Sequence, residues 1–306
     1  MDLLKKLKEH VETAKNPLIV VLGPTASGKT ALSIKLAQLY GGEIISTDSR
    51  QIYQEMPIST DAISPEERKG IPHHLLEVVK PNRVLTLSEY KDLAFQKIDD
   101  IFAGNNIPVL AGGTGLYLSA IIENYHLPHI PPNPKLREKL ENELKEKGSE
   151  HLYKKLLKID PGAAKKIHLH NVRYLIRALE INDFGQNKTD LKKKSQFSSF
   201  LLGIEWPRAE LYQRVNLRVD NQLERGLVNE VKSLLDKGYQ KELPSMSSLG
   251  IKEIIPYIKG QMSLEECIEI LKRNTRRYAK RQMTWFRRYD NVSWLSPKEL
   301  EKIIHA

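Results

Sequence analysis

The sequence predicts an α/β protein in which helices flank a parallel sheet and a helical segment interrupts the order of the strands. Three strand-length apolar runs carry this prediction, and the first, residues 18–22, is apolar throughout, as suits a strand buried on both faces. Helical periodicity separates the runs, which is typical of a parallel sheet with crossover helices. The expected strands are 18–22, 43–49 and 107–114, and the expected helices between them are 30–40 and 88–102.

Composition excludes several classes of protein. The chain has 306 residues, of which 40% are hydrophobic and 28% charged, so a fibrous or largely disordered protein is excluded. No apolar run approaches the ~20 residues of a membrane span, and the first ten residues lack the apolar core of a signal peptide. Cys267 is the single cysteine, which excludes an intrachain disulfide and a metal site built from cysteines. We expect a cytoplasmic protein that does not bind membranes.

The order of the segments predicts a core with one insertion. A helix is expected over residues 1–16, before Pro17 and the first strand. The alternation of strand and helix stops near Asn124, where a proline-rich linker over 127–134 leads into a charged, helical stretch. We therefore assign residues 1–122 and 199–306 to a core and residues 123–198 to a helical insertion domain. Further elements are expected in the second part of the chain: a polar loop at 185–195, strands at 197–204 and 292–295, and helices at 135–181, 208–237, 249–259 and 264–289.

A phosphate-binding motif follows the first strand. Residues 23–30 match G-x-x-x-x-G-K-[ST] and stand between a predicted strand and a predicted helix, the context that the motif requires. In such a loop glycine lets the backbone approach an anion, and the amides of the helix start converge on phosphate oxygens. Lys29 adds a positive charge, and the hydroxyl of Thr30 can reach Mg²⁺. The alternative, a chance glycine-rich turn, does not explain the flanking elements. The motif predicts a P-loop NTPase-like core that binds a diphosphate or nucleotide through Gly23, Pro24, Thr25, Ala26, Ser27, Gly28, Lys29 and Thr30.

Two further positions are expected beside this loop. ATP or GTP chemistry normally uses an aspartate that ends an apolar strand and binds Mg²⁺. The third strand ends without a carboxylate, whereas Asp48 follows the second strand. Because ligands bind outside the carboxyl ends of parallel strands, Asp48 and Thr114 are expected in the same crevice as the loop. Asp48 then acts as a general base, a Mg²⁺ partner or a cap, and Thr114 as a site residue or a helix N-cap.

Basic residues later in the chain suggest a polyanionic partner. Lys and Arg total 48 against 38 Asp and Glu, a net charge of +10, and residues 272–288 hold eight Lys or Arg and no acid. Tyr278, Trp285 and Phe286 are interleaved with them, so the segment suits contacts with phosphates and unpaired bases. An amphipathic helix with a solvated basic face is the alternative.

Arginines and histidines elsewhere allow structural or functional roles. Arg214 and Arg218 share a helix face and suit a leaving diphosphate, although pairing with Asp220 and Glu224 is favoured by the sequence alone. A metal site at the histidines lacks further ligands at a defined spacing; they are His73, His74, His168 and His170.

In combination these residues resemble the tRNA dimethylallyltransferase family, also called tRNA isopentenyltransferases, over almost the whole chain. The matching motifs are GPTASGKT at 23–30, ISTDSRQIY at 45–53, IPHHLLEV at 71–78, VLAGGTGLY at 109–117, IRALEI at 176–181, LYQRVNLRVD at 211–220 and AKRQMTWFRR at 279–288. The resemblance implies transfer of a dimethylallyl group from dimethylallyl diphosphate to N6 of adenine-37 in tRNAs that read codons beginning with U. The loop would then hold an isoprenoid diphosphate, with Mg²⁺ as the cofactor.

The resemblance also implies roles for individual residues. Asp48 matches the general base, Arg218 the arginine that steadies the leaving diphosphate, and Thr114 a residue near the reacting groups. The insertion matches a domain that grips the anticodon stem-loop. Positions expected to contact tRNA are Asp48, Ser49, Arg50, Gln51, Arg137, Arg173, Tyr174, Arg177 and Arg281. The zinc finger of eukaryotic members is absent, as expected of a bacterial-type enzyme, and we expect a monomer.

The chain departs from the family pattern in its tRNA-binding segments. Tyr174 stands where arginine is frequent, His170 where asparagine is usual, and Leu169 where proline is common. Gly250–Ile251 replaces the usual Gly-Tyr. Three alternatives stay open: a small-molecule kinase that uses ATP, an enzyme that prenylates free adenine nucleotides, and a non-catalytic RNA-binding protein that retains the phosphate loop.

Overall fold

The computed structural model describes residues 2–127, 130, 133–185 and 194–305, and within them it contains one parallel sheet. The sheet has six described strands in the order β3-β2-β4-β1-β5-β6, and all neighbouring strands are parallel. The strands are β1 (Pro17–Leu22), β2 (Gly42–Ser46), β3 (His73–His74), β4 (Ile107–Gly112), β5 (Ser198–Ile204) and β6 (Val292–Leu295). This is the predicted α/β class with a P-loop-like core.

Strand β1 lies at the centre of the sheet because both of its faces are apolar. Its residues 18–22 are fully buried. Leu18, Val20 and Leu22 point into one layer of the core, while Ile19 and Val21 point into the other. The registers Val21↔Ala111 and Leu22↔Gly112 set the ends of β1 and β4 side by side. The loops that follow these strands therefore begin at one edge of the sheet.

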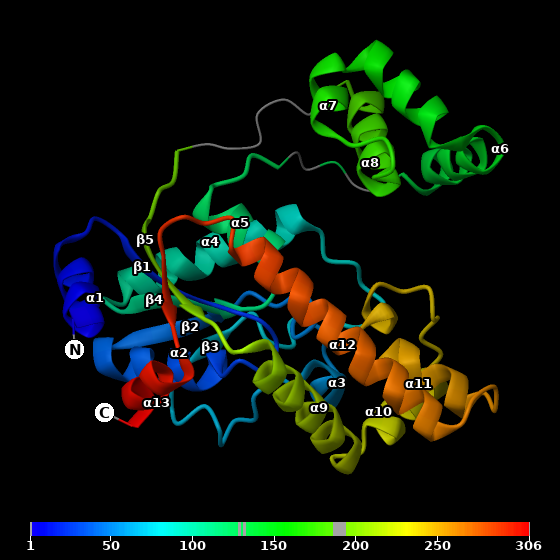
Figure 1. Cartoon of the computed structure of the whole chain (residues 1–306). Helices are drawn as coiled ribbons and strands as arrows, with labels where there is room; N and C mark the ends of the chain where they lie inside the picture. Colours follow the sequence, from blue (N-terminus) through cyan, green and yellow to red (C-terminus); the bar gives the residue numbers. More distant parts are fainter. Residues whose placement is uncertain (1, 128–129, 131–132, 186–193, 306) are drawn as a thin grey trace. The chain divides into compact units, whose positions relative to one another are not determined.

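Helices cover both faces of the sheet (Figure 1). One layer holds α1 (Asp2–Thr13), α2 (Lys29–Tyr40) and α13 (Pro297–His305). The other holds α4 (Leu87–Ala103), α5 (Gly115–Ile122) and the C-terminal half of α12 (Leu264–Phe286), whose Phe286 is fully buried. A capping box formed by Ser263 and Glu266 begins α12, as a helix start requires. The layers leave the carboxyl edge of the sheet to the loops.

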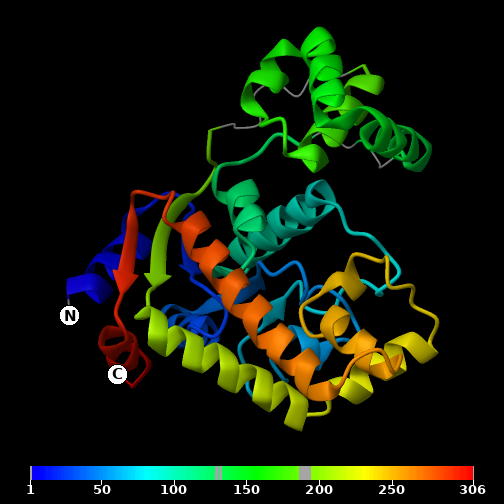
Figure 2. The same cartoon turned by 45° about the vertical axis from the view of Figure 1, so that its right-hand side comes forward.

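The C-terminal helices differ in part from the prediction. The single helix expected over 208–237 is wrong: α9 (Arg208–Glu224) ends at Glu224, and α10 (Leu227–Asp236) begins after Gly226. Gly226 has a φ of 95°, which turns the chain out of the helical path. Helix α9 then runs beside α12 (Figure 2). Short elements not anticipated from the sequence are α3 (Pro57–Thr60), β3, the 3₁₀ turn η1 (Ser245–Ser247) and α13. The helix expected over 249–259 is α11, which spans Ile251–Ile258.

Residues Glu123–Lys194 form a second compact unit, and the first unit comprises Met1–Ile122 and Ser195–Ala306. The second unit is helical (Figure 1), with α6 (Pro134–Ile159), α7 (Pro161–Lys166) and α8 (Val172–Asp183). Gly148, with φ 75° and ψ 174°, breaks α6 into two segments that fold back on a leucine-rich core. Most of the linker prolines and the predicted loop residues 186–193 lie outside the described residues.

Candidate active site

The phosphate loop joins β1 to α2 as the motif predicts. Gly28, at φ 97°, begins α2 in a left-handed conformation that suits glycine. The Lys29 ammonium donates a hydrogen bond to the Pro24 carbonyl at 2.7 Å. Within the described residues the buried Ser27 hydroxyl has no hydrogen-bond partner. The loop thus combines a helix start, a partly buried cation and a hydroxyl without a hydrogen-bond partner, a combination that suits a phosphate group.

Lys29 lies in an environment that disfavours its own charge. Burial, with the nearby positive charge of Arg218, lowers the pKa of Lys29 to about 8, while Asp48 acts in the opposite direction. The two cations face the same pocket. An anion bound there would oppose the effects of burial and of Arg218 on the pKa of Lys29, because it would stabilise the charged form of the lysine.

We therefore expect pyrophosphate affinity to depend on pH. A lysine with a pKa of about 8 loses its proton as the pH rises through that value, so the wild-type protein should bind pyrophosphate less tightly above it and take up protons on binding. Isothermal titration calorimetry at several pH values, in buffers of different ionisation enthalpy, measures both the affinity for pyrophosphate and the number of protons taken up. In Lys29→Arg the guanidinium stays charged, so this decline should vanish, while titration of pyrophosphate itself is common to both proteins. The same pH dependence in both would contradict the assignment.

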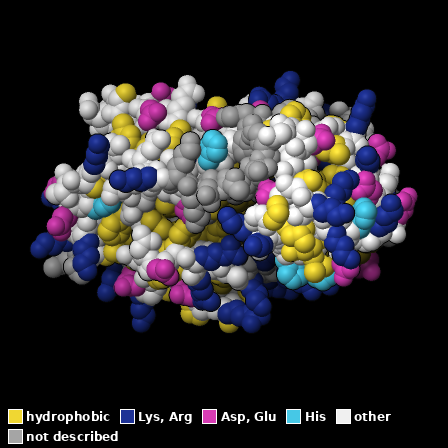
Figure 3. Space-filling model, turned by 90° about the horizontal axis from the view of Figure 1, so that it is seen from above, with side chains coloured by type: hydrophobic (Ala, Val, Ile, Leu, Met, Phe, Trp, Pro, Cys, Tyr) yellow, Lys and Arg dark blue, Asp and Glu magenta, His cyan; other side chains and the backbone are white. Residues whose placement is uncertain are grey.

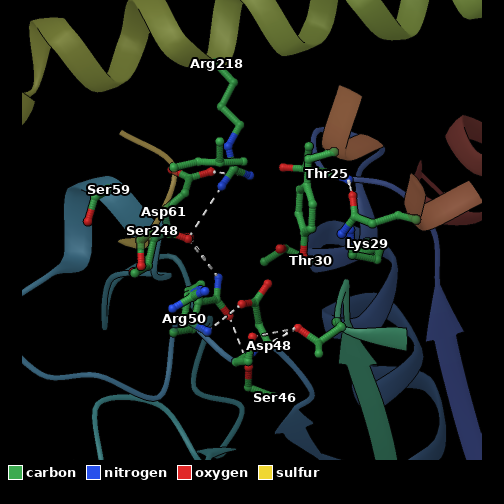
Figure 4. Close-up of a pocket in the computed structure, with 18 of the residues that line it drawn as sticks. Thr25, Lys29, Thr30, Ser46, Asp48, Arg50, Ser59, Asp61, Arg218 and Ser248 are labelled. Atoms are coloured by element: carbon green, nitrogen blue, oxygen red, sulfur yellow. Dashed lines mark hydrogen bonds and ion pairs between the residues drawn. The ribbon is translucent and has the colours of Figure 1, made fainter. Parts of the chain in front are cut away.

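Asp48 lies two residues beyond β2 and lines the same pocket, of about 410 Å³, as Lys29 (Figure 4). Its Oδ1 accepts the backbone N–H of Arg50 at 2.8 Å, which fixes the turn that presents the carboxylate. Thr114 accepts the Ser49 N–H at 3.0 Å and donates to the Ser49 hydroxyl at 3.2 Å. The turn after β2 and the turn after β4 are therefore tied together beside Asp48.

Arg218 enters the pocket from α9 (Figure 4). Its Nη1 lies 3.0 Å from an Asp61 carboxylate oxygen, and the other oxygen of Asp61 lies 2.8 Å from Arg225. The sequence-favoured pairing of Arg218 with Asp220 is wrong, because Asp220 pairs with Lys272 at 2.7 Å. Arg218 therefore lines the pocket as the ion-pair partner of Asp61, and its Nη2 donates a long hydrogen bond, of 3.5 Å, to the Thr60 carbonyl.

Arg214, one turn earlier on α9, bonds to the phosphate loop itself. Its Nε donates to the Ala26 carbonyl at 2.8 Å, and its guanidinium lies 4.2 Å from the centroid of the Trp206 ring. Trp206 in turn donates its indole N–H to the Ser27 carbonyl at 2.9 Å. These contacts hold the loop from the outside.

The remaining core residues predicted to contact RNA surround the pocket. Arg50 donates to the Pro244 carbonyl, and Gln51 accepts the Ser46 hydroxyl at 3.1 Å. Arg281 lines the pocket with its guanidinium over the ring of Tyr278. Burial, together with Asp48, raises the pKa of Tyr278 to about 12, although a hydrogen bond to Thr114 acts in the opposite direction. Tyr278 is therefore neutral at physiological pH.

Comparison with known proteins decides the family. The sequence model of the family described as "IPP transferase" matches residues 51–289. The chain belongs to the IPP transferase family. Similar curated members, both called tRNA dimethylallyltransferase, come from Alkaliphilus metalliredigens and Acetivibrio thermocellus. Each is 46% identical to this chain, and the matches cover 95% and 94% of this chain and 96% and 95% of the relatives.

Solved structures of IPP transferases share the fold. The tRNA isopentenylpyrophosphate transferase from Bacillus halodurans is 40% identical with a TM-score of 0.71, and the match covers 95% of each chain. A eukaryotic dimethylallyltransferase, described as acting on tRNA, is 31% identical with a TM-score of 0.76 and is matched over 92% of this chain and 74% of its own. The fold predicted from the sequence is therefore that of the family.

One site residue of this IPP transferase was missed by sequence reasoning. Gln282 of α12 accepts the Thr25 N–H and donates to the Gly113 carbonyl, both at 2.8 Å and both buried. The side chain therefore ties the phosphate loop to the turn that carries Thr114. The available signal was a polar residue on the apolar face of an amphipathic helix, four residues, or about one helical turn, before the buried Phe286.

In the second unit, two arginines predicted to contact tRNA are held by one buried carboxylate. Arg137 donates to both oxygens of Glu180 at 2.7 and 2.8 Å, and Arg177 donates to one at 3.0 Å. Burial raises the pKa of Glu180, but hydrogen bonds from both arginines and the Asn133 N–H lower it overall. These arginines stabilise the unit's interior, and their contact with tRNA stays a prediction. Arg173 and Tyr174 are exposed on α8.

Proposed function

We propose that this IPP transferase moves a dimethylallyl group from dimethylallyl diphosphate to N6 of adenine-37 in tRNAs that read codons beginning with U. The products are N6-isopentenyladenosine and diphosphate. The observation that carries the proposal is the placement of the phosphate loop, Arg218 and Asp48 around one pocket. The names of its relatives, which specify dimethylallyl transfer and tRNA, support the proposal.

The chemistry follows from the opposite demands of the two reactants. The adenine N6 amine is a weak nucleophile, and attack on the allylic carbon develops positive charge on it, so Asp48 is suited to accept an N6 proton. The new C–N bond forms as the allylic C–O bond breaks, and that electron pair leaves with the diphosphate. Lys29 and Arg218 stabilise the negative charge that develops there. Thr114 positions the turn that presents Asp48 through its bonds to Ser49.

The residues of the pocket fit a magnesium ion that arrives with the diphosphate. Thr30 supplies a hydroxyl oxygen in the same pocket, and no cluster of three metal-ligating side chains occurs among the described residues. Mg²⁺ favours such sites, in which one or two protein oxygens act together with phosphate oxygens and water. When bound, the ion would neutralise charge on the leaving diphosphate.

The proposal also requires that the target base reach the pocket and that the protein surface bind tRNA. A base in a stacked anticodon loop must leave its stack to reach the pocket. Lys and Arg side chains are spread over the surface seen in Figure 3, and α12 exposes Arg273, Arg277 and Lys280. We assign tRNA backbone contacts to this helix and stem-loop contacts to the helical unit 123–194.

No described helix is long and apolar enough to cross a membrane. A cytoplasmic monomer fits this proposal.

Radiolabelled dimethylallyl diphosphate tests the function directly. The protein is incubated with the labelled donor, Mg²⁺ and either unmodified tRNA or AMP, and we expect label in tRNA alone. Label in AMP but not in tRNA would favour the enzyme of free nucleotides. ATP turnover without label in RNA would favour a kinase, and tRNA binding without any transfer would favour a non-catalytic RNA-binding protein.

Binding of tRNA should weaken steeply with salt, because each neutralised phosphate releases a counterion. We expect the plot of log affinity against log salt concentration to be linear. The double variant Arg273→Gln/Arg277→Gln should reduce its slope by about one to two. Lys298→Gln removes a charge from α13 in the opposite layer of the sheet and should leave the slope unchanged. A wild-type affinity that does not change with salt would contradict phosphate contacts on α12.

A further inference from the structure

Asp61 lies between two guanidinium groups, that of Arg218 on α9 and that of Arg225 directly after this helix. One carboxylate oxygen lies 3.0 Å from Arg218 Nη1, and the other lies 2.8 Å from Arg225 Nη1. Asp61 and Arg218 line the pocket, whereas Arg225 is not among the lining residues and its side chain is 46% exposed. The carboxylate therefore links a pocket arginine to an arginine outside the pocket.

The turn that carries Asp61 is fixed on several sides. Gln222 donates to the Ile58 carbonyl at 2.8 Å, and Glu230 accepts the N–H groups of Ile58 and Ser59 at 2.7 and 2.8 Å. Gln51 donates to the Asp61 carbonyl at 3.1 Å. A carboxylate on such a turn has a fixed position, so its ion pair with Arg218 restricts the conformations of that long side chain.

The geometry leaves part of the Arg218 guanidinium free. Nη1 pairs with Asp61, and Nη2 donates a long hydrogen bond, of 3.5 Å, to the Thr60 carbonyl, whereas a guanidinium has five N–H donors in a planar fork. An arginine held along one edge presents its other donors in a set direction. Arg218 lines the same pocket as Lys29 of the phosphate loop, and its charge contributes to the lowered pKa of that lysine.

We propose that Asp61 is a positioning residue that holds Arg218 in the orientation required by the departing diphosphate, with Arg225 holding Asp61 from the other side. This inference rests on the proposed function and adds to it a residue that acts through Arg218. It predicts that loss of the Asp61 charge slows the chemical step far more than it weakens tRNA binding, because the aligned guanidinium matters most when charge develops on the leaving group.

The competing explanation is that Asp61 opposes the diphosphate. A carboxylate in an anion-binding pocket repels an incoming anion, so its removal would then speed the reaction or tighten pyrophosphate binding. The two explanations predict opposite signs for the same substitution. A purely structural role would act equally with or without Arg218.

A double-mutant cycle separates these explanations. The single-turnover rate of prenyl transfer to tRNA is measured for wild type, Asp61→Asn, Arg218→Ala and the double variant. Asn keeps the shape of Asp and tolerates the left-handed backbone at residue 61, where φ is 52°. The matched control is Glu55→Gln: Glu55 also has a positive φ, of 66°, and pairs with Lys237 at 2.6 Å, but it does not line the pocket.

We expect Asp61→Asn to lower the rate about ten-fold in the wild-type background and less than about two-fold beside Arg218→Ala, with the KM for tRNA within about two-fold of wild type. Glu55→Gln should leave the rate unchanged in both backgrounds. An equal loss in both backgrounds, an unchanged rate or a faster one would overturn the proposal.

Failure of the proposed function is recognised separately. If the wild-type protein transferred no prenyl group to tRNA, the function would fall, but the same four proteins would still be compared by calorimetric binding of inorganic pyrophosphate. Positioning of Arg218 by Asp61 predicts a loss of affinity from Asp61→Asn that disappears beside Arg218→Ala. Equal effects in the two backgrounds, or tighter binding by Asp61→Asn, would then refute it.

Discussion

Asp48→Asn is expected to lower the rate of prenyl transfer by about 10²-fold or more, because the amide has the shape of the carboxylate but cannot accept the N6 proton. Affinity for tRNA should stay within about three-fold, since an amide oxygen can still accept the Arg50 N–H that shapes the turn. Single-turnover transfer and a filter-binding titration measure the two quantities.

The control for this substitution is Asp236→Asn at the exposed end of α10, outside the pocket. It makes the same chemical change and should leave both the rate and the tRNA affinity unaltered. Asp48 would not be the base if Asp48→Asn retained wild-type turnover. A parallel loss of rate and tRNA affinity would instead identify Asp48 as a binding residue.

Lys29→Met should reduce the rate by about 10² to 10³-fold, as removal of a preorganised donor to a developing anion does elsewhere. Methionine retains most of the length of the side chain, so the buried space beside Pro24 stays filled while the charge and its hydrogen bond are lost. Pyrophosphate binding should also weaken measurably in calorimetry, in contrast to tRNA binding.

Lys35→Met on the same helix is the matched control, because Lys35 does not line the pocket. Circular dichroism of both variants checks that α2 is intact. If the two substitutions reduced the rate equally, the effect of Lys29→Met would come from the helix and not from the anion-binding charge.

The predictable part of the site consists of residues whose role depends on local sequence. The phosphate loop is contiguous, so its spacing and flanking elements were sufficient to predict it. Asp48 and Thr114 follow apolar strands, and parallel topology brings the ends of such strands to one edge. The sheet therefore placed these two residues in the pocket with Lys29.

The unpredictable part consists of contacts between distant segments. The partner of Arg218 is Asp61, far away in the sequence, whereas the nearby acid Asp220 pairs with Lys272. Gln282 reaches Thr25 across an even longer separation. Neither pairing leaves a periodic pattern in the chain. The end of α9 was missed for a different reason: apolar residues continue at helical spacing on both sides of Gly226, and only its backbone angle reveals the break.

The amide of Gln282 has a mechanical consequence. Helix α12 carries exposed cations on its outer side. On its inner side, the Gln282 amide forms hydrogen bonds with two separate stretches of backbone. Because Gln282 is bonded to both Thr25 and Gly113, we expect a displacement of α12 to shift the phosphate loop and the turn after β4 together.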